Sequence, residues 1–262
     1  NNYFTGLFTF GDGEANNLAY TVSLSRDNTR INPIFPTGGS SFNISAKFAP
    51  PYSLFTGRDF SNLENLPEFQ DSNGNPLIAL IDQEKFKWLE FYKVKFNGTW
   101  YTKIFADLVL KTQADFGFIG TYNQSRGNIP FERFFLGGDG MVNYALDGRE
   151  NIALRGYPNQ SLSNRDGSVI YNKFSLELRY PITLKPSASI YALTFLEAGN
   201  GYDSFRTFDP FNSKRSAGAG VRIFMPAFGL LGIDFGYCFD NPNPNTFTPN
   251  GWETHFVIGQ RF

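Results

Sequence analysis

Residues 102–118 read TKIFADLVLKTQADFGF, and this run gives the strongest structural signal in the chain. Every second residue from Thr102 onward is apolar or small, whereas the residues between them include Lys103, Asp107 and Asp115. Alternation with a period of two is typical of a β-strand whose two faces have different surroundings. Strands usually have about 5–6 residues. The run therefore predicts an unusually long strand, within residues 101–120.

The same alternation recurs along the chain and predicts an all-β fold of about ten strands. The predicted strands are 3–11, 17–27, 40–49, 86–97, 101–120, 170–181, 188–199, 215–225, 229–239 and 252–262. Short Pro- and Gly-rich segments separate several of them, as at 35–39, 181–186 and 225–229. Two connections, 50–85 and 121–169, are long. Short turns at one end and long loops at the other are typical of a barrel.

Three features favour a transmembrane antiparallel β-barrel over a soluble β-sandwich or lectin-like domain. The predicted strands reach about ten residues or more, enough to cross a bilayer at a tilt. Aromatic residues such as Trp100, Tyr101 and Tyr180 lie near strand ends, where an interfacial girdle would lie. The polar faces carry Lys, Asp, Glu and Arg, which suit a watery lumen better than a dry core. The soluble sandwich remains the alternative.

The composition fits this interpretation and narrows the function. Aromatic residues make up 18% of the 262 residues, 30 of them Phe, and only 18% are charged, against about 25% in an average protein. The net charge of −1 provides no basic face for nucleic acid. The sequence contains no run of 18 apolar residues, so no transmembrane helix is predicted.

The scarcity of Cys and His argues against an enzyme. Cys238 and His255 are the only residues of their kinds, so a disulfide within the chain is excluded and a zinc site would lack ligands. A Ser-His-Asp triad would have to use His255, close to the C-terminus. We therefore expect no catalytic residue, no metal and no cofactor.

Three segments carry a resemblance to a known family. They are FERFFLGGDG at 131–140 with LRGY at 154–157, IYALTFLEAGN at 190–200, and HFVIGQRF at 255–262. Their order and spacing resemble the C-terminal barrel of the BamA family, the insertases of the β-barrel assembly (BAM) machinery, and most closely its Bacteroidota branch. That family has E-R-F-x-x-G-G leading to V-R-G-F/Y on the sixth extracellular loop, and F-x-D-x-G on a later strand. Here Leu154 replaces Val and Glu197 replaces Asp.

The resemblance implies a barrel of sixteen strands preceded by POTRA domains. Residues 1–262 would then be the C-terminal portion of that barrel, with long extracellular loops at 50–85 and 121–169. The POTRA domains and roughly the first six strands would be absent, so barrel closure would need the missing part.

A contact between loop and barrel wall is the first predicted site. Glu177 and Glu197 both lie on the lumen-facing parity of their strands, and an Arg fork can bind carboxylates bidentately. The resemblance implies that Arg155, Gly156 and Tyr157 fold back as a latch against these carboxylates, with Gly156 allowing a tight backbone. The alternative is a solvated loop arginine.

The final predicted strand is the second site. By parity Phe256, Ile258 and Phe262 face lipid. The resemblance implies that this strand pairs loosely with the first strand and forms a lateral gate, at which an exposed edge can template an incoming strand. Gly259 would kink the strand there, or it is simply a small lumen-facing residue.

The resemblance implies an outer-membrane protein insertase of a Gram-negative bacterium. It would fold and insert β-barrel proteins through a lateral seam, by strand templating and local membrane destabilisation, without ATP. Its partners would be unfolded outer-membrane clients, BAM accessory lipoproteins and outer-membrane lipid, including LPS. A passive porin or transporter barrel is the alternative.

Overall fold

The computed structural model describes residues 14–29, 32–141, 148–242 and 251–259, and its main element is one antiparallel sheet of nine strands. The strands follow the order β1 (Tyr20–Asp27), β2 (Gly38–Ala49), β3 (Phe91–Phe105), β4 (Leu108–Gly120), β7 (Ile170–Lys185), β8 (Ala188–Tyr202), β9 (Lys214–Met225), β10 (Gly229–Cys238) and β11 (Trp252–Gly259). The predicted all-β class and antiparallel arrangement are confirmed. Within the described residues the sheet is not closed, with β1 and β11 at its two ends. The predicted strand 3–11 lies outside the described residues.

The prediction that residues 101–120 form one strand is wrong, because the run contains a hairpin. β3 ends at Phe105, β4 begins at Leu108, and the turn has Ala106 at φ 47°. The pairing also shifts between Lys103 and Phe105, where Lys103 faces Val109 but Phe105 faces Leu108. The two-residue turn and this irregularity together keep odd-numbered residues on the same face in both strands. The alternation therefore continues through the turn and hides it.

Two other predicted boundaries are also wrong. The predicted strand 86–97 starts too early, since β3 begins at Phe91 and Phe86 ends a helix. The turn predicted at 181–186 is shorter and lies later in the chain, because β7 continues to Lys185 and β8 begins at Ala188. Pro181 lies at a shift in pairing, the kind of position where a strand tolerates proline.

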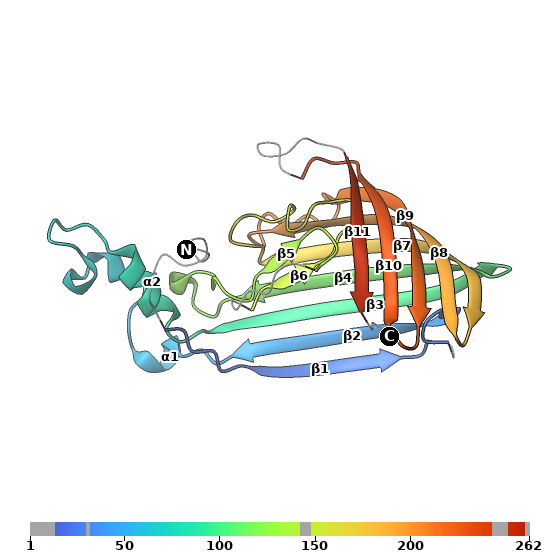
Figure 1. The fold of residues 1–262 in the computed structure, drawn as a ribbon. Coiled ribbons are helices and arrows are strands. Elements are labelled where there is room, and N and C mark those ends of the chain that lie inside the picture. Colours follow the sequence, from blue (N-terminus) through green and yellow to red (C-terminus); the bar gives the residue numbers. More distant parts are fainter. Residues whose placement is uncertain (1–13, 30–31, 142–147, 243–250, 260–262) are drawn as a thin grey trace.

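The connection predicted as a loop at 50–85 contains short helices. They are α1 (Ser53–Thr56), η1 (Leu63–Asn65), η2 (Pro67–Phe69) and α2 (Ile78–Phe86). These helices form a small unit beyond one end of the sheet (Figure 1), with a core of Phe60, Leu63, Phe69 and Ile81. We call residues 50–90 the insertion. None of the helices in the described residues is long and apolar enough to cross a membrane.

The connection at 121–169 is called the inner loop below, and its described parts, 121–141 and 148–169, lie against the inside of the curved sheet (Figure 1). It contains η3 (Gln124–Arg126) and two short parallel strands, β5 (Phe134–Leu136) and β6 (Glu150–Ile152). Its Leu154 and Tyr157 are fully buried and share a core cluster with Phe91 of β3.

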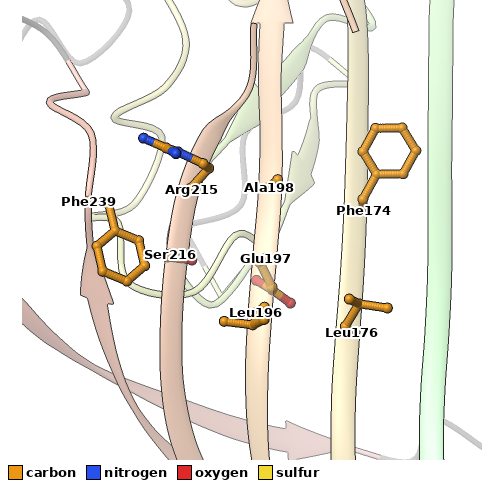
Figure 2. A pocket seen from close by; sticks show the side chains of 8 residues that line it. All are labelled: Phe174, Leu176, Leu196, Glu197, Ala198, Arg215, Ser216 and Phe239. Atoms are coloured by element: carbon orange, nitrogen blue, oxygen red, sulfur yellow. The ribbon is translucent and has the colours of Figure 1, made fainter. Parts of the chain in front are cut away.

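The two faces of the sheet differ as the alternation predicts. On β7, Ser175 and Glu177 are buried on the inner face, whereas Phe174 and Leu176 are exposed on the outer face. The outer face has an apolar hollow of about 480 Å³ over β7, β8 and β9 (Figure 2). Its lining residues are Phe174, Leu176, Leu196, Ala198, Arg215 and Phe239, together with Glu197 and Ser216, whose side chains are buried on the inner face. The charged face is therefore covered by the inner loop and the apolar face is open.

Candidate functional site

The inner loop brings Arg155 against carboxylates on three strands. Its Nη2 lies 2.7 Å from Oε1 of Glu177 on β7 and 2.7 Å from Oε1 of Glu197 on β8. Its backbone N–H also donates to Oε2 of Glu197 at 2.8 Å, and its Nη1 lies 3.4 Å from Oδ2 of Asp234 on β10. The structure thus brings together Arg155, Glu177 and Glu197, the three charged residues expected to meet, and adds Asp234.

Further cations on the sheet complete this cluster. Arg179 donates to the second oxygen of Glu177 at 2.6 Å, and Arg222 binds Asp234 through two hydrogen bonds of 2.7 and 2.6 Å. All of these side chains are buried. Burying charges costs free energy unless they are paired and hydrogen-bonded. The pairing offsets this cost and allows the loop to stay buried against the sheet.

Arg155 remains charged in this setting. Burial alone would lower its pKa, but the negative charges of Glu197, Glu177 and Asp234 raise the pKa above its ordinary value. Its guanidinium also lies 3.8 Å from the centre of the Phe195 ring, a cation–π contact.

Gly156 and Tyr157 allow the backbone next to Arg155 to pack closely against the sheet. Gly156 has φ +86°, and a Cβ there would lie 2.8 Å from Cβ of Ser216. On the facing strand, a Cβ at Gly236 would lie 2.6 Å from the nitrogen of Gly156. The tight backbone expected at Gly156 therefore depends on two glycines. Tyr157 is fully buried and donates its hydroxyl to the carbonyl of Arg215 at 2.7 Å.

Sequence reasoning did not assign two residues of this site. Asp234 shares the inner face, and His255 accepts the backbone N–H of Gly156 through Nε2 at 2.8 Å. Parity was the available signal, because Asp234 and His255 face each other in the β10–β11 pairing and both are buried. From the sequence alone, His255 is weighed only as a possible zinc ligand or catalytic base.

A second group of ion pairs anchors the inner loop to β2 and β3. Glu132 contacts Lys47 and Lys93, and Glu150 lies 2.5 Å from Nζ of Lys93 and 2.9 Å from Nζ of Lys95. Burial would raise the pKa of Glu150, but the two lysines lower it below its ordinary value. The loop is thus held at separate places along the sheet.

The structure describes three of the four residues expected to act at the final strand. Phe256 and Ile258 are exposed on the outer face, 53% and 68% respectively. Gly259 still faces Leu230 of β10 and has φ +146°, a backbone conformation that residues with side chains rarely adopt. Phe262 lies outside the described residues.

The charged groups of the two ion-pair clusters hold the inner loop on the sheet. In the described ranges, no three His, Cys, Asp or Glu residues gather where a metal ion could be held. The paired charges hold a loop against a sheet, and among the described strands the sheet ends at β11.

An antiparallel sheet with an apolar outer face, a charged inner face and a loop returning over that inner face defines a protein of the β-barrel class. The chain belongs to the Omp85 superfamily, whose domain model matches residues 5–262.

The fold is similar to that of a solved structure, BamA from Haemophilus ducreyi lacking POTRA domains 1–3. The TM-score is 0.57 at 17% identity, and the match covers 91% of this chain and 41% of that one. A comparison with curated proteins finds no match. The expected resemblance is thus confirmed at the level of fold and superfamily.

Proposed function

We propose that this chain forms the C-terminal part of the barrel of an outer-membrane insertase, which folds and inserts β-barrel proteins at a seam beside β11. Membership of the Omp85 superfamily supports an assembly role. The observation that carries the proposal is the position of β11 at one end of the sheet, where it has β10 as its neighbour among the described strands.

An edge strand offers unpaired N–H and C=O groups that an incoming strand can use by β-augmentation. Gly259 supports this role, because its φ of +146° ends the described part of β11 in an unusual backbone conformation. In the proposed mechanism a client strand exchanges backbone hydrogen bonds at the seam, with no covalent step and no ATP. The exposed apolar outer face would thin and disturb the bilayer locally.

The inner loop supports an insertase more than an open pore. It lies inside the curve of the sheet and is held there by Arg155, Glu132 and Glu150. We propose that the loop fixes the curvature of the wall next to the seam, as expected for the latch.

The partners and location follow from the same proposal. They are unfolded outer-membrane clients, accessory lipoproteins of a BAM complex, and the lipid and LPS of a Gram-negative outer membrane. We infer no enzymatic activity, no cofactor and no nucleic-acid partner.

The test is client folding in liposomes containing the full-length protein purified with its bound partners. A urea-unfolded outer-membrane barrel is added without ATP, and its folding is followed by heat-modifiable migration in gels. We expect faster folding than in empty liposomes. Large, stable conductance without faster client folding would contradict the proposal and identify the passive porin or transporter instead.

A further inference from the structure

His255 gives β11 a direct connection to the inner loop. Its Nε2 accepts the backbone N–H of Gly156 at 2.8 Å, although the two residues are 99 positions apart. Only 4% of His255 is exposed, so water does not compete readily for this hydrogen bond.

The Gly156 N–H needs this acceptor. A buried backbone N–H without a partner costs free energy comparable to a lost hydrogen bond. Gly156 lies in an irregular segment, and its backbone is pressed against Gly236 of β10. The lone pair of a neutral imidazole nitrogen accepts a hydrogen bond, whereas a protonated nitrogen does not.

The adjacent strand is tied to the same segment by a different group. Asp234 of β10 faces His255 across the strand pair and lies 3.4 Å from Arg155. The loop therefore holds β10 by an ion pair and β11 by a backbone hydrogen bond, and it reaches the strand at the end of the sheet through His255.

We propose that His255 is a positioning residue that keeps β11 on the sheet by accepting the Gly156 N–H, so that docking of the inner loop and pairing of β11 are coupled. Release of the loop then weakens β11, and loosening of β11 exposes the Gly156 N–H. The assignment rests on the proposed function only in treating β11 as the seam strand.

The chemistry of the acceptor gives a selective test. The amide of Gln reaches about as far as Nε2 of His, whereas the amide of Asn stops near the position of Nδ1. His255→Gln should keep an acceptor at the right place, and His255→Asn and His255→Leu should not. Thr254→Val, on the exposed outer face of the same strand, is the matched control.

The experiment is hydrogen-exchange mass spectrometry of the full-length protein in lipid nanodiscs, with folding of each variant first checked by heat-modifiable migration. We expect exchange in segments 154–158 and 252–259 to rise at least about fivefold in the Asn and Leu variants, as for a lost buried hydrogen bond. The Gln variant and the control should stay close to the original protein. If the Leu variant fails to fold, the comparison of Gln with Asn decides.

Two outcomes would overturn the proposal. One is equal exchange in the Gln and Asn variants, and the other is exchange in the Leu variant no faster than in the control. Client folding by the same variants separates this proposal from the proposed function. Faster exchange with unchanged client folding supports the coupling and contradicts the role of β11 as the seam. Unchanged exchange with slower client folding contradicts the coupling and supports the role of β11 as the seam.

Discussion

At the residue scale, the guanidinium of Arg155 connects β7, β8 and β10 through Glu177, Glu197 and Asp234. A single Arg can do this because it has five N–H donors in a rigid fork. The carboxylates are buried, and Arg155 adds to the charge compensation that cations of the sheet, such as Arg179 and Arg222, already give them.

Replacing Arg155 by Ala should therefore destabilise the folded chain by about 3–5 kcal/mol, the usual cost of removing one partner from a buried ion pair. The measurement is the urea midpoint of heat-modifiable migration. Arg215→Ala is the control, because Arg215 pairs with Asp240 at an exposed position and the backbone carbonyl that Tyr157 uses is retained. Equal shifts in the two variants would contradict the importance of the buried cluster.

Gly156→Ala should undock the segment around it. The new alanine would have an unfavourable φ, and its Cβ would lie 2.8 Å from Cβ of Ser216. Gly57→Ala is the control, because Gly57 has φ +61° but no atom of the described part of the chain lies within 4 Å of a Cβ there. We expect protease cleavage in the inner loop to increase several-fold for Gly156→Ala only. Similar cleavage of the inner loop in both variants would contradict a specific role of Gly156 in docking it.

The contacts of this site were only partly predictable from sequence. Parity places Glu177 and Glu197 on the inner face, but their pairing with Arg155 came from the family resemblance. Asp234 and His255 share that face, yet nothing in an alternating pattern tells which inner residues a loop will reach. That choice depends on the curvature of the sheet, which the pattern does not encode.

At the element scale, alternation identified the strands better than their ends. Nine of the predicted strands correspond to the nine strands of the sheet, but the hairpin at Ala106 was hidden because the inner-face phase continues through it. The helices of the insertion were also missed. They are short, and α1 has only four residues, so no helical periodicity extends over enough residues to be recognised.

The end of β11 allows a test of backbone conformation. Gly259→Val should slow client folding several-fold, because Val is strongly disfavoured at a φ of +146° and would straighten or unpair the strand there. Among the described residues no atom lies within 4 Å of a Cβ at this position, so a collision with them would not explain the effect. Gly251→Val is the control, because a Cβ there also has no atom of the described residues within 4 Å. Normal client folding by Gly259→Val would reject the kink.

Glu150 makes docking of the inner loop sensitive to acid. Its pKa is below its ordinary value of 4.5, so its ionised form stabilises the docked loop above that pH, and the contribution is lost as the pH falls through the lowered pKa. Exchange protection of segment 148–153 should fall as the pH drops below 4.5 and through the lowered pKa of Glu150, and by less in Glu150→Gln. The exposed Glu64→Gln should behave like the original protein. An identical fall in all three would assign the effect to other carboxylates.

At the scale of the whole molecule, the insertion, the inner loop and the sheet form one connected body. Arg126 of the inner loop lies 2.7 Å from Glu90 and donates to the carbonyls of Lys85 at 2.9 Å and Trp88 at 2.6 Å. Glu90 also accepts two hydrogen bonds from Ser53. The insertion is thus fastened to the loop that the sheet holds.

Arg126→Met should loosen the insertion by about 3–5 kcal/mol, because it leaves the buried Glu90 unpaired. Protease cleavage within 50–90 should accelerate while the heat-modifiable transition of the sheet stays in place. Arg58→Met is the control, since Arg58 pairs with the partly exposed Glu84 inside the insertion. A lower transition of the whole sheet would show that the insertion and sheet unfold together.

The latch also dictates an order of folding. Arg155 is 22 positions from Glu177, 42 from Glu197 and 79 from Asp234, and Gly156 is 99 from His255. Contacts between such distant positions form late because the chain entropy of closing the intervening segments is lost first. We therefore expect the inner loop to reach its final position after β7 to β11 have assembled, so that its docking completes this part of the wall.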